Sequence, residues 1–138
     1  MNDHHTLPRQ LANQILRHAQ QHPETEVCGL VGARDGHACT VYPVPNVASE
    51  PDHLYTMQAE GQIAAMRHMR EQGEELFAIY HSHPHAPAEP SLRDLELAAY
   101  PEALYLIISL NTKGVLEMRA YRLQGGKVNN VELVVEES

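Results

Sequence analysis

Apolar residues recur three and four positions apart in two stretches of the chain, which is the spacing of an amphipathic helix. The first stretch covers residues 7–21 and the second covers roughly residues 57–72. Gly73 follows the second stretch, at the position where a helix commonly ends in a left-handed conformation. A third helix is expected over SLRDLELAAY, which Ser91 opens and Pro101 stops.

Short apolar runs between and after these helices predict the strands of a sheet. LFAIY and LYLIISL are continuous apolar runs, as in central strands that are covered on both faces. The turns RDGH, NTKG and QGGK are typical of connections between neighbouring antiparallel strands. The expected strands are VCGLVGA, residues 38–44, LFAIY, LYLIISL, residues 115–123 and residues 128–135.

The predicted order is α-β-β-α-β-α-β-β-β, with no internal repeat and no second domain. Such an order is typical of an α/β fold in which helices pack on a mixed sheet. We expect residues 1–138 to form a single domain, because that length suits one hydrophobic core. The loop PVPNVASEPDHLYTM is long for a compact domain, and loops of this kind are often functional.

Composition and charge exclude several classes of function. The formal net charge is −8 and no Lys/Arg cluster is present, which argues against a nucleic-acid partner. The polar N-terminus lacks the apolar region of a signal peptide, and the run ALYLIISL is too short to span a membrane. Cys28 and Cys39 are too few for a disulfide framework and fit free thiols in a reducing compartment. We therefore expect a cytoplasmic protein.

The segment YHSHPHAPAEPSLRDL, residues 80–95, carries the candidate chemistry. His81 and His83 follow the strand LFAIY, and residues two apart on a strand project to the same face. Asp94 lies on the first turn of the next helix, after a loop stiffened by three prolines. Two imidazoles and one carboxylate on a zinc ion would leave its fourth position for water, as in catalytic sites.

Simpler interpretations of these residues remain open at this point. Ser91 followed by an acid three residues later is a normal helix start, although the same serine could also present its hydroxyl to a site. His81 and His83 alone would fit an exposed or hydrogen-bonded loop.

Two further residues suggest alternative chemistry. His85 could complete a site of three imidazoles, but Pro84 disfavours a regular strand there, and a role beside the substrate is the alternative. Cys28 could be a nucleophile with a histidine as its base, or simply a small buried residue in a strand. The zinc pattern of the cytidine deaminases, HxE with a later PCxxC, is absent.

Together these residues resemble the motif of the JAMM (MPN-type) zinc metallopeptidases. That motif is an upstream glutamate, then HxH, seven residues, serine, two residues and aspartate, and the chain has HSH, PHAPAEP, Ser91, LR and Asp94 in that order. EVCGLVGA resembles the upstream element, with Glu26 in the glutamate position and Val27 as one additional residue. The NVA loop, the IYHSHP strand and the YLIISL strand resemble the small bacterial stand-alone members most closely.

The resemblance covers nearly the whole chain and implies an α/β MPN (cytidine-deaminase-like) fold. It implies that His81, His83 and Asp94 hold one Zn²⁺ per chain. Glu26 would be the general base, with Glu24 as its nearest rival, and Ser91 would donate a hydrogen bond to the oxyanion.

The resemblance also implies a substrate. Asn46, Tyr55 and His85 would contact the tail of a ubiquitin-like or sulfur-carrier protein that ends in Gly-Gly, held by backbone pairing on a sheet edge. The enzyme would cut a peptide or isopeptide bond after that tail and could release cysteine, which would place it in cysteine biosynthesis. No membrane partner is expected, and a homodimer is left open.

Two other functions compete with this one. A non-catalytic MPN scaffold would only bind a protein partner, but such members usually lose ligands, and all five motif positions are filled here. A family associated with DNA repair shares the HxHP…PSxxD core, but the acidic charge and the Glu26 segment weigh against it.

Overall fold

The computed structural model describes residues 4–111 and 116–137. Its strands form one seven-stranded sheet in the order β1-β7-β6-β5-β4-β2-β3. In chain order the elements are β1 (His4–Pro8), α1 (Arg9–Gln21), β2 (Cys28–Arg34), β3 (His37–Val44), α2 (Ala59–Glu71), β4 (Glu75–His83), α3 (Leu92–Leu97), β5 (Leu104–Ser109), β6 (Glu117–Gln124) and β7 (Lys127–Glu136).

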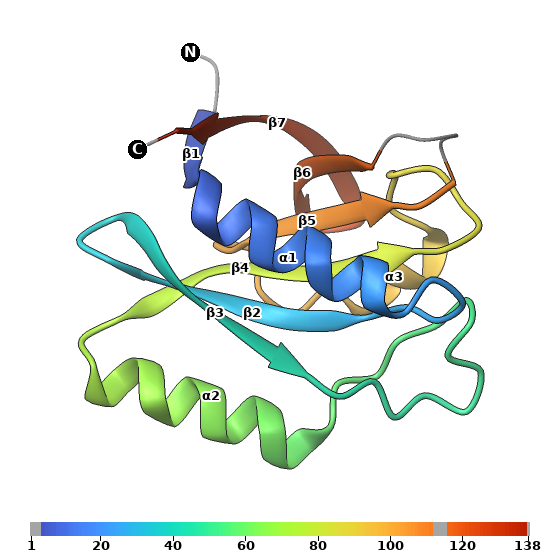
Figure 1. Cartoon of the computed structure of the whole chain (residues 1–138), viewed down its shortest axis with the longest axis horizontal. Helices are drawn as coiled ribbons and strands as arrows, with labels where there is room; N and C mark the ends of the chain where they lie inside the picture. The colour runs from blue at the N-terminus through green and yellow to red at the C-terminus, as the bar shows by residue number, and fades with distance from the viewer. Residues whose placement is uncertain (1–3, 112–115, 138) are drawn as a thin grey trace.

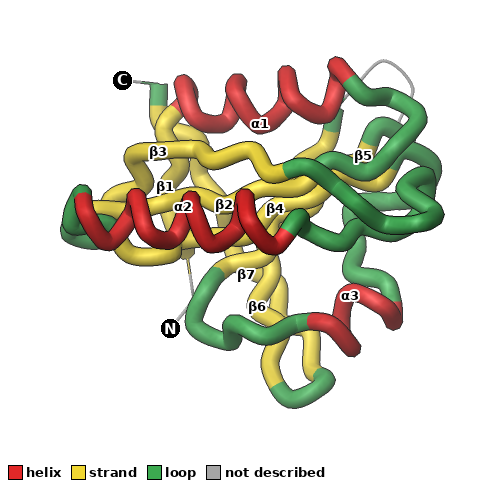
Figure 2. The backbone as a smooth tube through the Cα atoms, turned by 90° about the horizontal axis from the view of Figure 1, so that it is seen from below, coloured by secondary structure: helices red, strands yellow, loops and turns green. Residues whose placement is uncertain are grey.

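The sheet is mixed, as the sequence predicted. β4 pairs with β5 in parallel and β1 pairs with β7 in parallel, while the other neighbours are antiparallel. The sheet curves so strongly that its two edge strands, β1 and β3, come into contact. Helix α1 covers one face, and α2 and α3 lie on the other, as Figures 1 and 2 show. The predicted α/β class with packed helices is therefore confirmed.

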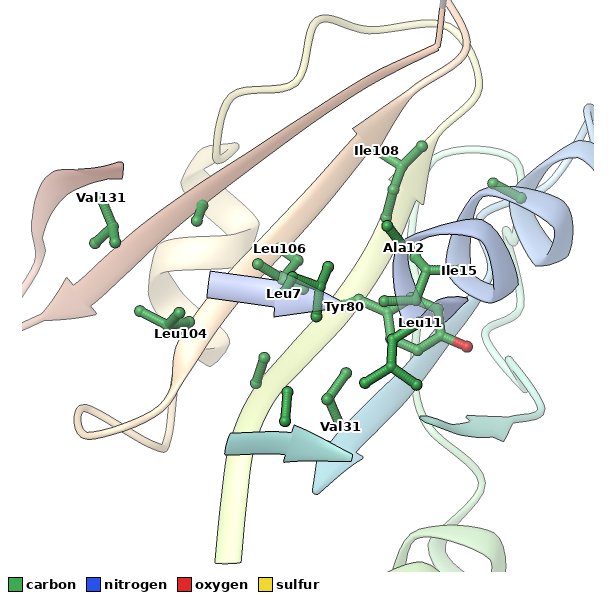
Figure 3. Close-up of a cluster of buried hydrophobic side chains, with 14 of the residues drawn as sticks. Leu7, Leu11, Ala12, Ile15, Val31, Tyr80, Leu104, Leu106, Ile108 and Val131 are labelled. Atoms are coloured by element: carbon green, nitrogen blue, oxygen red, sulfur yellow. The ribbon is translucent and has the colours of Figure 1, made fainter. Parts of the chain in front are cut away.

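The hydrophobic core has two halves, one on each face of the sheet. On the α1 face, Leu11 and Ile15 pack beside Tyr80 of β4 (Figure 3). On the opposite face, Ile79 packs in a cluster with Met69 of α2 and other apolar side chains. Because side chains alternate along a strand, β4 directs its odd-numbered residues from position 79 onward to the α2 and α3 face. This alternation decides which end residues of β4 share a site.

The N-terminal prediction is wrong in one respect. Residues 7–8 belong to a short strand, β1, and the helix begins only at Arg9. Leu7 is fully buried, as the helical pattern implied, but it pairs with Val135 of β7 at the other end of the chain. A five-residue strand that depends on such a distant partner leaves little local signal in the sequence.

The third helix is shorter than predicted, because it ends at Leu97 and not at Tyr100. The hydroxyl of Tyr105 accepts hydrogen bonds from the backbone amides of Ala99 and Tyr100, both at 3.1 Å. A tertiary contact therefore takes over amides that a longer helix would have bonded internally.

The turns follow the expected chemistry where the structure describes them. In QGGK, Gly125 and Gly126 have φ values of 59° and 75°, as a tight hairpin turn requires, and Gly73 after α2 has a φ of 70°. Residues 112–114 of the predicted NTKG turn lie outside the described residues. Within residues 4–111 and 116–137, every helix is too short or too polar to cross a membrane.

Candidate metal centre

The two motif histidines are strand residues at the end of β4. His81 pairs with Cys28 of β2 and His83 pairs with Ser109 of β5, so the ladder fixes the backbone of both. Their Nε2 atoms lie 3.1 Å apart, and both side chains are buried. Burial lowers the pKa of His81, which favours the neutral imidazole that a metal ion binds.

Asp94 reaches the same point from the start of α3. Ser91 and Asp94 form a capping box, in which Ser91 Oγ accepts from the Asp94 amide at 3.0 Å and Asp94 Oδ2 accepts from the Ser91 amide at 2.9 Å. The same Oδ2 atom lies 3.2 Å from His81 Nε2 and 3.4 Å from His83 Nε2. The helix cap therefore also aims the carboxylate, and the Ser91 hydroxyl keeps its own hydrogen for another acceptor.

The donor set fits a cation. His83 Nδ1 lies 2.8 Å from the carbonyl oxygen of Pro87, which can only accept, so Nδ1 carries a proton and Nε2 is the nitrogen that can bind a cation. Asp94 Oδ2 is also an acceptor. His81 Nε2 faces both of these acceptors, and with the His81 proton on its buried Nδ1 it would be a third lone pair at the same point. A bound cation would satisfy all three lone pairs at once.

Glu26 completes the cluster from the segment before β2. One of its carboxylate oxygens and one ring nitrogen each of His81 and His83 all lie within 4.8 Å of one another. Its side chain is buried, and burial raises its pKa to about 7, while His83 opposes that shift. Glu24, the rival in the sequence, is exposed, with its carboxylate 3.9 Å from His85 Nε2. Glu26 is thus the glutamate that the fold brings to the histidines.

The alternative chemistries do not gain support from the geometry. His85 follows the end of β4 and its side chain is 62% exposed, facing Glu24. Cys28 is buried, its Sγ lies 3.3 Å from the Val44 carbonyl oxygen, and burial raises the pKa of its thiol to about 12. A thiol in that state is a poor nucleophile at neutral pH.

The long loop after β3 closes over the centre. Tyr55 stacks on His81 with ring centroids 4.5 Å apart and an interplanar angle of 23°. Asn46, which the sequence suggested as a substrate contact, uses its side chain for hydrogen bonds to the backbone of its own chain. In Figure 1 this loop, the end of β4 and α3 gather at one end of the sheet.

Beside Tyr55 lies a hollow of about 350 Å³ between the loop, α2 and α3. Its walls are mostly apolar and aromatic, and they include Arg93, the residue before Asp94. Nothing in the sequence predicts that these residues lie together, since they come from separate elements. The lining includes Leu30, Tyr55, Met57, Ile79, Arg93, Leu97, Tyr100 and Tyr105.

Comparison with known proteins gives the same picture. The chain is 34% identical over 128 residues to a desampylase of Haloferax volcanii, covering 88% of this chain and 89% of that protein. It is 30% identical over 128 residues to the CysO-cysteine peptidase of Mycobacterium tuberculosis, covering 92% and 88%. It is 35% identical over 130 residues to a Thermus thermophilus protein named "Probable TtuB-protein conjugate cleaving protease", covering 94% and 81%.

Comparison with solved structures points to the same family of proteins. The solution structure of protein DSY2949 from Desulfitobacterium hafniense superposes with a TM-score of 0.85 at 34% identity, covering 96% of this chain and 93% of that one. The JAB1/MPN domain protein AF2198 of Archaeoglobus fulgidus shares the fold, with a TM-score of 0.62 at 19% identity over 94% and 98% of the two chains. The predicted MPN fold and the resemblance to JAMM peptidases are confirmed. Since residues 8–124 match the family described as prokaryotic homologues of the JAB domain, this chain belongs to the Prok-JAB family.

Proposed function

We propose that this chain is a zinc peptidase that cuts a peptide or isopeptide bond after the C-terminal tail of a ubiquitin-like or sulfur-carrier protein. One observation carries the proposal: two histidines and one aspartate converge within 3.4 Å beside a buried glutamate. The names of the relatives, which are peptidases and conjugate-cleaving enzymes, support the same class of reaction. The proposal treats residues 1–138 as one JAMM domain.

The metal ligands in this proposal are His81, His83 and Asp94. Zinc held there would lower the pKa of a water molecule and polarise the substrate carbonyl. Glu26 takes a proton from the attacking water and delivers it to the leaving amine, which suits a carboxyl group whose pKa is about 7. The Ser91 hydroxyl donates a hydrogen bond to the carbonyl oxygen as negative charge develops on it.

The hollow beside Tyr55 is the site that we assign to the substrate tail. An extended tail can pass between the loop and α3, with an apolar side chain in the hollow and its last residues beside Tyr55. Glycine suits those last residues because it lets the backbone approach a closed centre without a side chain. We assign Tyr55 to direct contact with the tail, and we assign His85, which is exposed beside Glu24, to the leaving-group side.

A cysteine leaving group would connect the enzyme to cysteine biosynthesis. We assign the protein to the cytoplasm, since Cys28 and Cys39 are both free thiols and fit a reducing compartment. A homodimer remains compatible with this proposal.

The experiment that tests the substrate class uses three fusions of one small carrier protein. Each ends in Gly-Gly, Ala-Ala or Val-Val before a C-terminal cysteine, and mass spectrometry measures the released carrier and cysteine. We expect the Gly-Gly fusion to be cleaved at least about 100-fold faster than the Val-Val fusion, because the bulkier tail misplaces the scissile bond. Equal rates for the three fusions would contradict the assigned tail site.

A further inference from the structure

The side chain of Asn46 makes four hydrogen bonds to the backbone. Its Nδ2 donates to the carbonyl oxygens of Glu26 and Leu54, both at 2.9 Å. Its Oδ1 accepts from the amides of Ala48 at 3.0 Å and Thr56 at 2.9 Å. A primary amide has two donor hydrogens and two acceptor lone pairs, so the whole capacity of this side chain is used within the protein.

One end of this network is the backbone of Glu26. Glu26 precedes β2, so the strand ladder does not hold it, and the loop supplies partners for both of its backbone groups. Its amide donates to the carbonyl oxygen of Pro51 at 2.7 Å, and its carbonyl oxygen accepts from Asn46. The next residue, Val27, is held from β4, because its amide donates to Ser82 Oγ at 2.9 Å. The backbone that carries the Glu26 carboxyl group is therefore fixed from two sides.

The other end of the network is Tyr55. Leu54 and Thr56, its two chain neighbours, are both bonded to Asn46, and the Tyr55 ring stacks on His81. Ligand histidines usually have their second nitrogen oriented by a hydrogen bond, which His81 Nδ1 lacks among the described residues. The stacked Tyr55 ring is thus one contact that orients the His81 imidazole, together with Asp94 at its Nε2.

We propose that Asn46 is a positioning residue that fixes the base Glu26 relative to the tyrosine over His81. This inference rests on the proposed function, because it takes Glu26 as the base. Asn46 has no free donor or acceptor for a substrate, so its effect falls on the rate of the chemical step and not on substrate binding.

The test replaces Asn46 by leucine, which keeps the size of the side chain and removes all four hydrogen bonds. The matched control is Asn129→Leu, at an exposed position on β7. With the Gly-Gly fusion as substrate, we expect kcat of Asn46→Leu to fall by about 10–100-fold, with KM changed less than about twofold. The control keeps the wild-type constants.

Two further measurements separate positioning from a merely structural role. In a Glu26→Gln background, followed over long incubations, Asn46→Leu causes a much smaller further fall, because most of its effect passes through Glu26. In chelator-treated protein, amide hydrogen exchange speeds up in Asn46→Leu at Ala48 and Thr56, while the amides of β4 and β5 keep their protection.

Three results would overturn the inference. A rise in KM with kcat unchanged would make Asn46 part of the substrate groove only. An equal fall in both backgrounds would show that Asn46 acts independently of Glu26 while leaving the proposed function intact. Full activity of Glu26→Gln itself would remove the proposed function, and this inference with it.

Discussion

Glu26→Gln loses about 10²–10⁴-fold in cleavage rate and keeps its metal. The carboxyl group lies within the cluster of His81 and His83 and is the buried glutamate that can exchange a proton there. Glutamine has nearly the same shape but cannot accept the proton of the attacking water. Since the three proposed ligands are untouched, zinc content by elemental analysis stays at the wild-type level.

The matched control is Glu24→Gln, two residues away. Glu24 is exposed and faces His85, so we expect the rate of this variant to stay within about twofold of wild type. The base assignment would be refuted if Glu24→Gln were the slow variant, or if Glu26→Gln cleaved the Gly-Gly fusion at the wild-type rate.

Asp94→Ala is expected to lose the metal and the activity together. Its Oδ2 atom lies 3.2 Å and 3.4 Å from the two imidazole nitrogens, and alanine leaves only two ligands. Removing a residue that only hydrogen-bonds to a metal ligand already lowers metal affinity by about 10–100-fold. Removing a ligand itself is expected to lower it further. Elemental analysis after dialysis against a weak chelator should find little zinc in this variant and a full complement in wild type.

Asp94 also caps α3, and a second variant separates the two roles. Asp94→Asn keeps an oxygen that can accept from the Ser91 amide, so the helix start survives, while the charge on the ligand is lost. We expect Asp94→Asn to unfold at nearly the wild-type temperature and still to bind zinc more weakly. Wild-type zinc content in both Asp94 variants would show that another residue holds the metal.

The sequence was sufficient for the part of the site that lies within one local segment. The two-residue spacing of His81 and His83 predicts a shared face as soon as β4 extends through them, and it does. Ser91 and Asp94 were expected at a helix start and form the capping box there. Both features involve residues close together in the chain, so residue type and spacing are enough to predict them.

The rest of the site depends on contacts between distant segments. Nothing local to Glu26 distinguishes it from Glu24, and only the resemblance to the JAMM motif favoured it before the fold placed it. Asn46 was expected to contact the substrate only because the JAMM resemblance places the substrate cleft in this region, and a simple Pro-Asn turn was the alternative. Its hydrogen bonds to Glu26 and Leu54 exist only in the folded loop.

The same limit explains the errors in the fold. The strand β1 depends on β7, and the early end of α3 depends on the hydroxyl of Tyr105. In both places a tertiary partner overrides a reasonable local pattern.

The measurement that tests the central claim most directly is a zinc titration of the chelator-stripped enzyme. Zinc is added in steps, and the initial rate of cleavage of the Gly-Gly fusion is followed at each step. We expect no measurable cleavage without metal, a linear rise, and a plateau at one zinc per chain, because one set of ligands converges at His81, His83 and Asp94. Full cleavage by the stripped enzyme, with no response to zinc, would contradict the account.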